Sequence, residues 1–150
     1  HSGWSAYTLE SFVQYLCARG RVHISSELPL PPGLEQYRYR GQVEQIHHLL
    51  SYCNCYIGES ATMSGEAVLL GVPAVYAACD RRSYTDELAA MGLLWKVPSV
   101  DYQSLQMALG EVEALGRDEL PKRLAAYLEG KVNLADYIVD AVIRQAGPAF

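Results

Sequence analysis

Short runs of apolar residues alternate along the chain with stretches whose apolar positions recur every three or four residues. The short runs predict strands at 21–25, 36–40, 53–58, 74–77 and 93–97. The periodic stretches predict helices at 8–19, 43–52, 62–70, 84–91, 102–115, 118–129 and 134–146. Strands that alternate with helices are typical of βαβ units, so the pattern predicts an α/β fold with a largely parallel sheet.

Glycines and small polar residues mark the expected helix ends. Gly20, Gly71 and Gly92 each follow the last periodic residue of a predicted helix, which is where a left-handed residue often ends one. Ser83 and Asp86 have the spacing of a capping box, so we expect that pair to begin the helix at 84–91.

The order of the predicted elements is irregular at its start. A doubly wound domain begins on a strand that becomes central in the order 3-2-1-4-5-6, whereas this chain begins on a helix. Without that strand, the sheet would split into two halves with unpaired backbone groups between them. Because the sequence also begins with His1 rather than Met, we expect a fragment whose first strand is missing.

Composition narrows the classes of partner. Half of the 150 residues are apolar and 19% are charged, which suits a packed core and excludes general disorder. The formal net charge is −5, and its sign argues against nucleic acid as a partner, although a single nucleotide stays possible. The basic residues are dispersed, and Arg38 with Arg40 and Arg81 with Arg82 are among the few local basic pairs.

No apolar run approaches the roughly 18 residues of a membrane-spanning helix, so we expect no transmembrane segment. The four cysteines include no C-x-x-C pair. Cys53 and Cys55 lie two apart in a predicted strand and should point to opposite faces, which suits neither a mutual disulfide nor zinc. We therefore expect buried, reduced thiols in a cytoplasmic protein, with peripheral association with a membrane left open.

The segment 57–67 is the most informative for chemistry. A buried strand ends at Gly58, a small polar turn follows, and a helix begins. The backbone N–H groups of Ser60, Ala61 and Thr62 would form an anion site at that helix N-terminus, unless Ser60 or Thr62 serves only as a cap. Glu66 lies one turn past Thr62, so it would accept hydrogen bonds from vicinal hydroxyls or act as an ordinary helical glutamate.

Other candidates have equally open alternatives. Glu59 precedes the turn and is either part of the site or a solvated loop residue, while Arg81 follows a strand end and either reaches a phosphate or is solvated. His47, on an apolar helix stripe, either packs or contacts a ligand. His23 lies within a predicted strand and is expected in the core. No cluster of ligands requires a metal, so we expect none.

Several motifs occur in an order and spacing that resemble a known family. They are Ser25-Ser26-Glu27, Gln45 to Leu50, Ile57 to Met63, Glu66 to Ala74, Tyr84 to Glu87 and Gly92-Leu93-Leu94. The chain is similar, over roughly 1–97 and most specifically over 57–74, to the family catalogued as domain of unknown function 354. That family resembles GT-B glycosyltransferases and the non-hydrolysing UDP-N-acetylglucosamine 2-epimerases, and the similarity is with their second, Rossmann-like half, which binds the nucleotide.

The resemblance implies roles for the residues of the turn. Ser60, Ala61, Thr62 and Met63 would face the diphosphate of a UDP-type nucleotide sugar, and Glu66 would face its ribose. The chain departs from the epimerase pattern because Ala61 and Thr62 replace two glycines and Gly65 replaces the first of two glutamates. The stretch 84–87 also lacks the Arg-Pro-Glu motif of the epimerases, which argues against epimerase chemistry.

We therefore expect a nucleotide-binding core at 1–97 and trailing helices at 98–150, which pack on the core or on a missing N-terminal domain. The function implied is the nucleotide-sugar-binding half of a glycosyltransferase-like protein, inactive alone because the catalytic base belongs to the missing domain. No cofactor is required, and no catalytic residue is assigned. The alternatives are a nucleotide-sugar epimerase or hydrolase on the same scaffold and a non-catalytic binding module. The apolar stripe of the last helix should be exposed, because in GT-B proteins that helix returns to the first domain.

Overall fold

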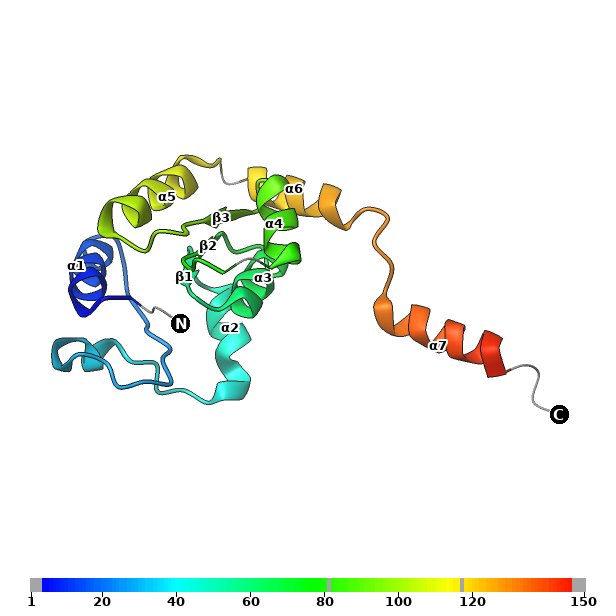
Figure 1. Cartoon of the computed structure of the whole chain (residues 1–150), viewed down its shortest axis with the longest axis horizontal. Coiled ribbons are helices and arrows are strands. Elements are labelled where there is room, and N and C mark those ends of the chain that lie inside the picture. Colours follow the sequence, from blue (N-terminus) through cyan, green and yellow to red (C-terminus); the bar gives the residue numbers. More distant parts are fainter. Residues whose placement is uncertain (1–3, 81, 117, 147–150) are drawn as a thin grey trace.

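A computed structural model describes residues 4–80, 82–116 and 118–146. Its sheet has three parallel strands, which in spatial order are β1 (Tyr56–Gly58), β2 (Ala74–Tyr76) and β3 (Leu94–Lys96) (Figure 1). Each strand is followed along the chain by a helix. The predicted α/β class and the parallel sheet are therefore confirmed.

Seven α-helices and two short 3-10 helices make up the rest of the described secondary structure. The α-helices are α1 (Ala6–Cys17), α2 (Ile46–Ser51), α3 (Ala61–Leu69), α4 (Ser83–Ala90), α5 (Tyr102–Ala114), α6 (Glu119–Leu128) and α7 (Leu134–Ala146). The 3-10 helices are η1 (Pro32–Tyr37) and η2 (Val43–Gln45).

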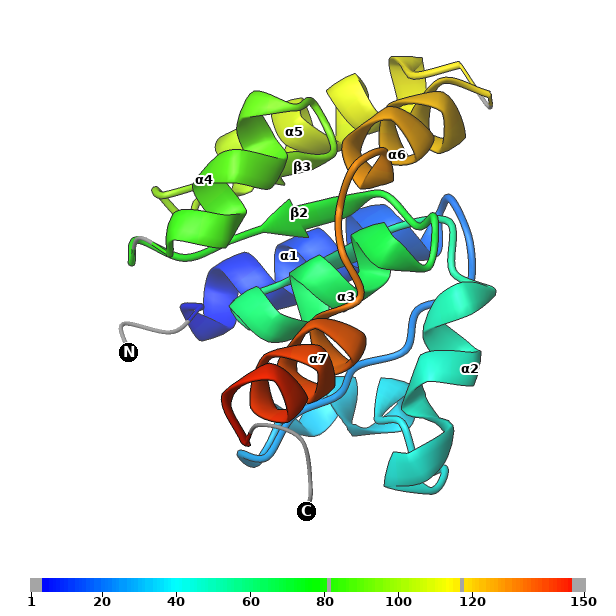
Figure 2. The same cartoon turned by 90° about the vertical axis from the view of Figure 1, so that its right-hand side faces the viewer.

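Helices cover both faces of the sheet, so the core has two parts. Alternate residues of a strand point to opposite faces. On one face, Ala74 and Tyr76 of β2 pack with buried side chains of α3, α4 and α6. On the other face, Val75 and Ala77 pack with buried side chains of α1 and α5. In Figure 2, α3 and α4 lie in front of β2, and α1 and α5 lie behind it.

The second face is rich in aromatic side chains. Both tryptophans, Trp4 and Trp95, pack against its core cluster. The ring centroid of Trp4 lies 5.9 Å from that of Phe12, which in turn lies 6.2 Å from Tyr102 in an edge-on arrangement. Such contacts join α1, and the residue Trp4 before it, to the start of α5.

The expected helix ends are confirmed at Gly71 and Gly92, but the one at Gly20 and the capping box are not. Helix α1 ends at Cys17, before Gly20, and Gly20 has no positive φ. Gly71 and Gly92 have φ of 78° and 65°, a conformation that side chains disfavour, and they follow α3 and α4. Helix α4 begins at Ser83 itself, so Ser83 cannot cap it. The hydroxyl of Thr85 instead donates a hydrogen bond of 2.9 Å to the backbone oxygen of Arg82.

The two predicted strands at 21–25 and 36–40 are wrong as strands. They meet only in a single parallel bridge between Ile24 and Arg38. Only Gln36 and Tyr37 of the second run lie in η1, which Pro32 begins. In the described residues no further strand pairs with this bridge, so it does not extend into a sheet.

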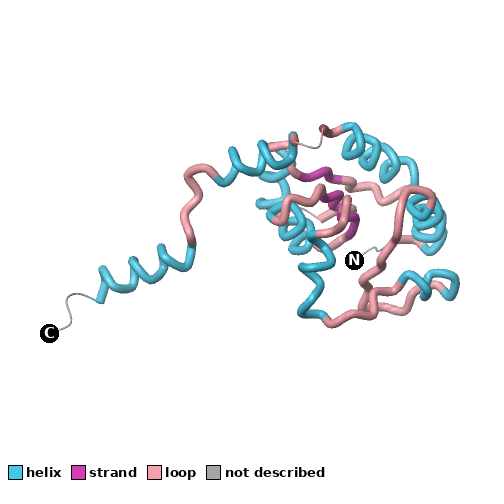
Figure 3. The backbone as a smooth tube through the Cα atoms, turned by 180° about the vertical axis from the view of Figure 1, so that it is seen from behind, coloured by secondary structure: helices cyan, strands magenta, loops and turns pink. Residues whose placement is uncertain are grey.

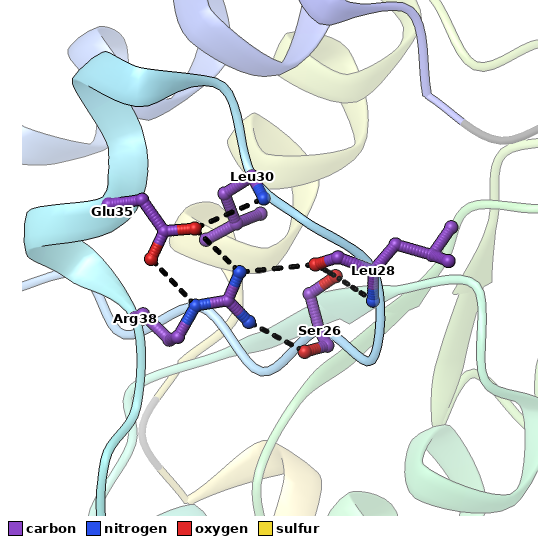
Figure 4. A network of polar contacts seen from close by, with 5 residues as sticks. All are labelled: Ser26, Leu28, Leu30, Glu35 and Arg38. Atoms are coloured by element: carbon purple, nitrogen blue, oxygen red, sulfur yellow. Dashed lines mark hydrogen bonds and ion pairs between the residues drawn. The ribbon is translucent and has the colours of Figure 1, made fainter.

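The side chain of Arg38 fixes the loop that precedes it (Figure 4). Its Nε and Nη2 donate to the two carboxylate oxygens of Glu35, at 2.8 and 2.7 Å. Its Nη1 and Nη2 also donate to the backbone oxygens of Ser26 and Leu28, at 2.7 and 3.1 Å. Glu35 further accepts the N–H of Leu30. This network favours a compact loop over an extended strand, because its bonds require the chain to fold back.

The next two elements along the chain are shorter in the structure than predicted. The helix predicted at 43–52 is divided into η2 and α2, and Val43 on its apolar stripe is 79% exposed whereas Leu50 is buried. The strand predicted at 53–58 is reduced to β1. His23 is exposed, so its expected place in the core is wrong.

All four cysteines are free thiols. Cys53 and Cys55 are half-buried, whereas Cys17 and Cys79 are exposed, so the expectation of buried thiols is wrong for the latter two. Burial, with smaller contributions from the negative charges of Cys53 and Glu113, raises the pKa of the Cys55 thiol to about 12. Cys55 therefore stays protonated at neutral pH.

The trailing helices differ in how they pack. The buried side chains of α5 and α6 belong to the two core clusters. Helix α7 projects away from the sheet on an extended connection, which Figures 1 and 3 show from opposite sides. Its large apolar side chains are 51% to 66% exposed. The prediction of an exposed stripe on the last helix is therefore confirmed.

Candidate functional site

The candidate site lies at the carboxyl end of β1, where the turn into α3 begins. The hydroxyl oxygen of Ser60 accepts the N–H of Met63 at 3.2 Å, so Ser60 caps the helix. The backbone oxygen of Ser60 also accepts the hydroxyl of the buried Ser64 at 2.8 Å. Within the described residues the N–H groups of Ala61 and Thr62 have no acceptor. They remain directed toward a ligand or water, as at other helix N-termini.

Tyr56 lies across the end of β1 and was missed by the sequence analysis. A Cβ atom on Gly58 would come within 2.5 Å of the Tyr56 hydroxyl oxygen, so the ring covers this glycine. Burial raises the pKa of Tyr56 to about 12, and a hydrogen bond with the backbone of Ser60 opposes the rise. The absence of a side chain at Gly58 was the only signal in the sequence for this contact.

Two of the predicted residues meet beside the turn. The Nε2 atom of His47, on α2, lies 3.1 Å from the Oε2 atom of Glu66, on α3. Their side chains are 55% and 38% exposed, so both remain accessible. Thr62 is exposed one helical turn before Glu66 and shares its side of the helix. His48 is exposed and is not part of this pair.

Acidic groups lie at the same edge of the sheet. Glu59 is half-buried, and desolvation together with the negative charge of Asp80 raises the pKa of its carboxyl group. Asp80, after β2, accepts hydrogen bonds from the hydroxyl of Tyr76 and from Nε of Arg82, and these bonds lower its pKa. Burial, with the bond to Asp80, raises the pKa of Tyr76 to about 12. The two carboxyl groups therefore have pKa values displaced in opposite directions.

The remaining predicted residues have less defined roles. Arg81 lies outside the described residues, but its neighbour Arg82 forms an ion pair of 3.0 Å with Asp80. Met63 is half-buried and takes part in the turn through its backbone N–H. In the described ranges no three His, Cys, Asp or Glu side chains are grouped so that they could hold a metal ion.

Among the helices of residues 4–80, 82–116 and 118–146, none has the length and apolar character needed to cross a bilayer. Comparisons of the chain with protein-family models, with curated proteins and with solved structures found no match. The resemblance of its motifs to the GT-B proteins therefore stays a prediction.

Proposed function

We propose that the chain is the nucleotide-binding half of a glycosyltransferase-like protein and that a UDP-type nucleotide sugar binds at the start of α3. The proposal rests mainly on Glu66, an accessible carboxylate one turn after the free N–H groups of Ala61 and Thr62. The N–H groups suit a diphosphate, and the carboxylate suits the vicinal hydroxyls of a ribose.

The position of this turn supports the proposal. In open parallel sheets, ligands bind beyond the carboxyl ends of the strands. The turn follows β1 at that end, and Glu59 and Asp80 follow the ends of β1 and β2. In the glycosyltransferase-like reaction, the N–H groups of α3 would stabilise the departing diphosphate.

His47 adds an orienting contact. Its 3.1 Å approach to Glu66 holds one carboxylate oxygen and leaves the other for a ribose hydroxyl. Because both side chains are partly exposed, the pair contributes little to folding. We therefore interpret it as positioning Glu66 for a ligand.

The finer fold assignment is part of the same proposal. In the strand order 3-2-1-4-5-6, the bridge of Ile24 with Arg38 would correspond to strands 2 and 3, and β1, β2 and β3 to strands 4, 5 and 6. The edge of β1 that does not pair with β2 would then be the place of the first strand. The catalytic base would belong to a separate N-terminal domain, so the chain alone would bind nucleotide without turnover.

One observation favours the non-catalytic binding module as second candidate. The Ser60 hydroxyl is used as a cap, and Tyr56 lies over the turn, which leaves less room for a diphosphate than two glycines would. The carboxylate of Glu59 would also repel phosphate when it is ionised. A module of this kind would keep the fold without binding UDP.

Calorimetry with UDP and UMP tests the proposal. We expect UDP to bind more tightly than UMP, because the second phosphate reaches the N–H groups of α3. Glu66→Gln should weaken UDP binding about tenfold or more, since it removes a charge-assisted hydrogen bond to the ribose. Glu129→Gln, at an exposed glutamate whose side chain has no partner among the described residues, is the matched control and should have no effect.

The outcomes separate the candidates. An absence of heat with UDP, or equal effects of the two glutamine variants, would contradict nucleotide binding and favour the non-catalytic module. Transfer of sugar by the isolated chain would contradict the proposal that it lacks the catalytic base. Release of free or epimerised sugar would favour the hydrolase or epimerase instead.

A further inference from the structure

A hollow of about 610 Å³ lies away from the α3 turn. It is formed by the end of α1 and by the two segments that the Ile24–Arg38 bridge joins. Four of its lining residues are Arg or His and two are Tyr, and no Asp or Glu lines it. These six residues are Arg21, His23, Tyr37, Arg38, Tyr39 and Arg40. A lining with basic but no acidic side chains is unexpected in a chain of net charge −5.

Two of the three arginines that line this hollow lack the ion pairs that the other described arginines form. Five arginines in the described part of the chain lie within 4.0 Å of a carboxylate. They are Arg19 with Glu113, Arg38 with Glu35, Arg82 with Asp80, Arg123 with Glu119 and Arg144 with Asp140. The two described arginines without such a partner are Arg21 and Arg40, and both line the hollow with exposed side chains.

The nearby acid does not neutralise this charge. Both carboxylate oxygens of Glu35 are held by Arg38, and Oε1 also accepts the N–H of Leu30. Hydrogen bonding to Arg38 lowers the pKa of Glu35 to about 2, and the positive charge of Arg40 adds to the effect. Arg38 is thus compensated within its loop, and the positive charge of Arg21 and Arg40 remains for another anion.

The two tyrosines give the hollow fixed walls. The hydroxyl of Tyr39 donates to the backbone oxygen of Gln42 at 3.0 Å, and its ring covers Gly41. A hydrogen bond with Cys17 raises the pKa of the Tyr37 hydroxyl. Both rings are half-buried, so part of each surface stays open to a ligand. Rings that are held in place bind a flat or apolar group at low entropic cost.

We propose that this hollow binds a phosphorylated small molecule, with the phosphate between Arg21 and Arg40 and the organic part against Tyr37 and Tyr39. Guanidinium groups suit phosphate because they present several donors in one plane. The site shares no residue with the α3 turn, so the proposal stands independently of nucleotide-sugar binding.

Titration with phenyl phosphate, followed by NMR and calorimetry, tests this site. We expect shifts at His23, Tyr37 and Tyr39 and none at Glu66. The double variant Arg21→Gln, Arg40→Gln should lose affinity about tenfold or more, because both phosphate contacts are removed. The control variant Lys122→Gln, Arg144→Gln removes the same charge from α6 and α7, and it should bind as the parent chain does.

Each result decides the question. Retained affinity in the Arg21 and Arg40 variant, or an equal loss in the control variant, would overturn the proposal, as would an absence of binding by the parent chain. Far-UV circular dichroism checks that the fold is kept, which we expect because both arginines are exposed and unpaired. Glu66→Gln should leave the binding of phenyl phosphate to this hollow unchanged, because Glu66 does not line it. Failure of the nucleotide proposal would appear in the UDP titrations and not in this one.

Discussion

Two regions of the chain carry strand-like patterns, but only one of them forms a sheet. Between 53 and 97, three runs become parallel strands, and the middle one, β2, is wholly buried between helices on both faces. Between 21 and 40, two runs form one bridge, and Val22 and Ile24 are only half-buried. We infer that a run forms a parallel strand when neighbouring strands pair with it and helices cover it, and that an apolar run alone is not enough.

The largest expected loss of stability comes from truncating a buried side chain that packs against the sheet. Leu105 on α5 is completely buried against the sheet, so Leu105→Ala should lower the free energy of unfolding by about 2–5 kcal/mol. Leu28 in the bridge region is 73% exposed, and Leu28→Ala should change stability by less than about 0.5 kcal/mol. Guanidinium chloride unfolding measures both. Equal losses would show that the bridge region is as well packed as the sheet.

A smaller effect is expected at the end of β1. Gly58→Ala places a methyl group against the Tyr56 hydroxyl, so the ring must move, at a cost of about 1–3 kcal/mol. The pKa of Tyr56 should then fall from about 12 toward its ordinary value of 10.0, as seen in an alkaline absorbance titration. Gly33→Ala, with nothing within 4 Å of an added Cβ, is the control in the bridge region. A displaced pKa that survives Gly58→Ala would contradict the described contact.

Acid should open the bridge region before the sheet. The pKa of Glu35 is lowered from 4.5 to about 2, and hydrogen bonding to Arg38 is the largest cause. The ionised form of Glu35 therefore stabilises the folded loop. That contribution is complete above about pH 4.5 and is lost as the pH falls toward 2. Hydrogen exchange should show falling protection of the Tyr39 amide, which bonds to Ile24, while the Val75 amide stays protected. Arg38→Gln should reproduce this at neutral pH, and simultaneous opening of both regions would contradict it.

The smallest effect is expected on α7. Ile138 is 51% exposed, so Ile138→Ser should leave the free energy of unfolding within about 0.5 kcal/mol of that of the parent chain. Leu120 on α6 is buried, and Leu120→Ala should cost about 2–5 kcal/mol under the same conditions. Comparable losses in the two variants would mean that α7 packs on the core in solution.

Much of the sheet could be predicted because its runs are short, apolar and separated by glycine or proline. The ends of α3 and α4 followed from Gly71 and Gly92 in this way. The strand predicted at 36–40 is wrong because the prediction uses only the local pattern of residues. The conformation there depends on the hydrogen bonds of Arg38 to Ser26 and Leu28, which lie ten or more residues away along the chain. Such contacts leave no local pattern.

The candidate site was predictable only in part, for the same reason. Ser60 and Glu66 were found from their places around a strand and a helix, and His47 from its place on another helix. Only the structure shows that His47 contacts Glu66, at 3.1 Å, and no spacing along the chain indicates this contact. Tyr56 was missed because a tyrosine within an apolar run is expected to be buried in any case. Its position in the sequence therefore gave no sign that its ring covers Gly58 at the turn.

The placement of the two tryptophans has a consequence for optical measurements. Because Trp4 and Trp95 both contact the cluster that α1 and α5 form on the sheet, their emission reports on that side of the molecule. Neither belongs to the cluster that α3, α4 and α6 form. A fluorescence unfolding curve would thus follow one half of the core, and its agreement with circular dichroism would test whether both halves unfold together.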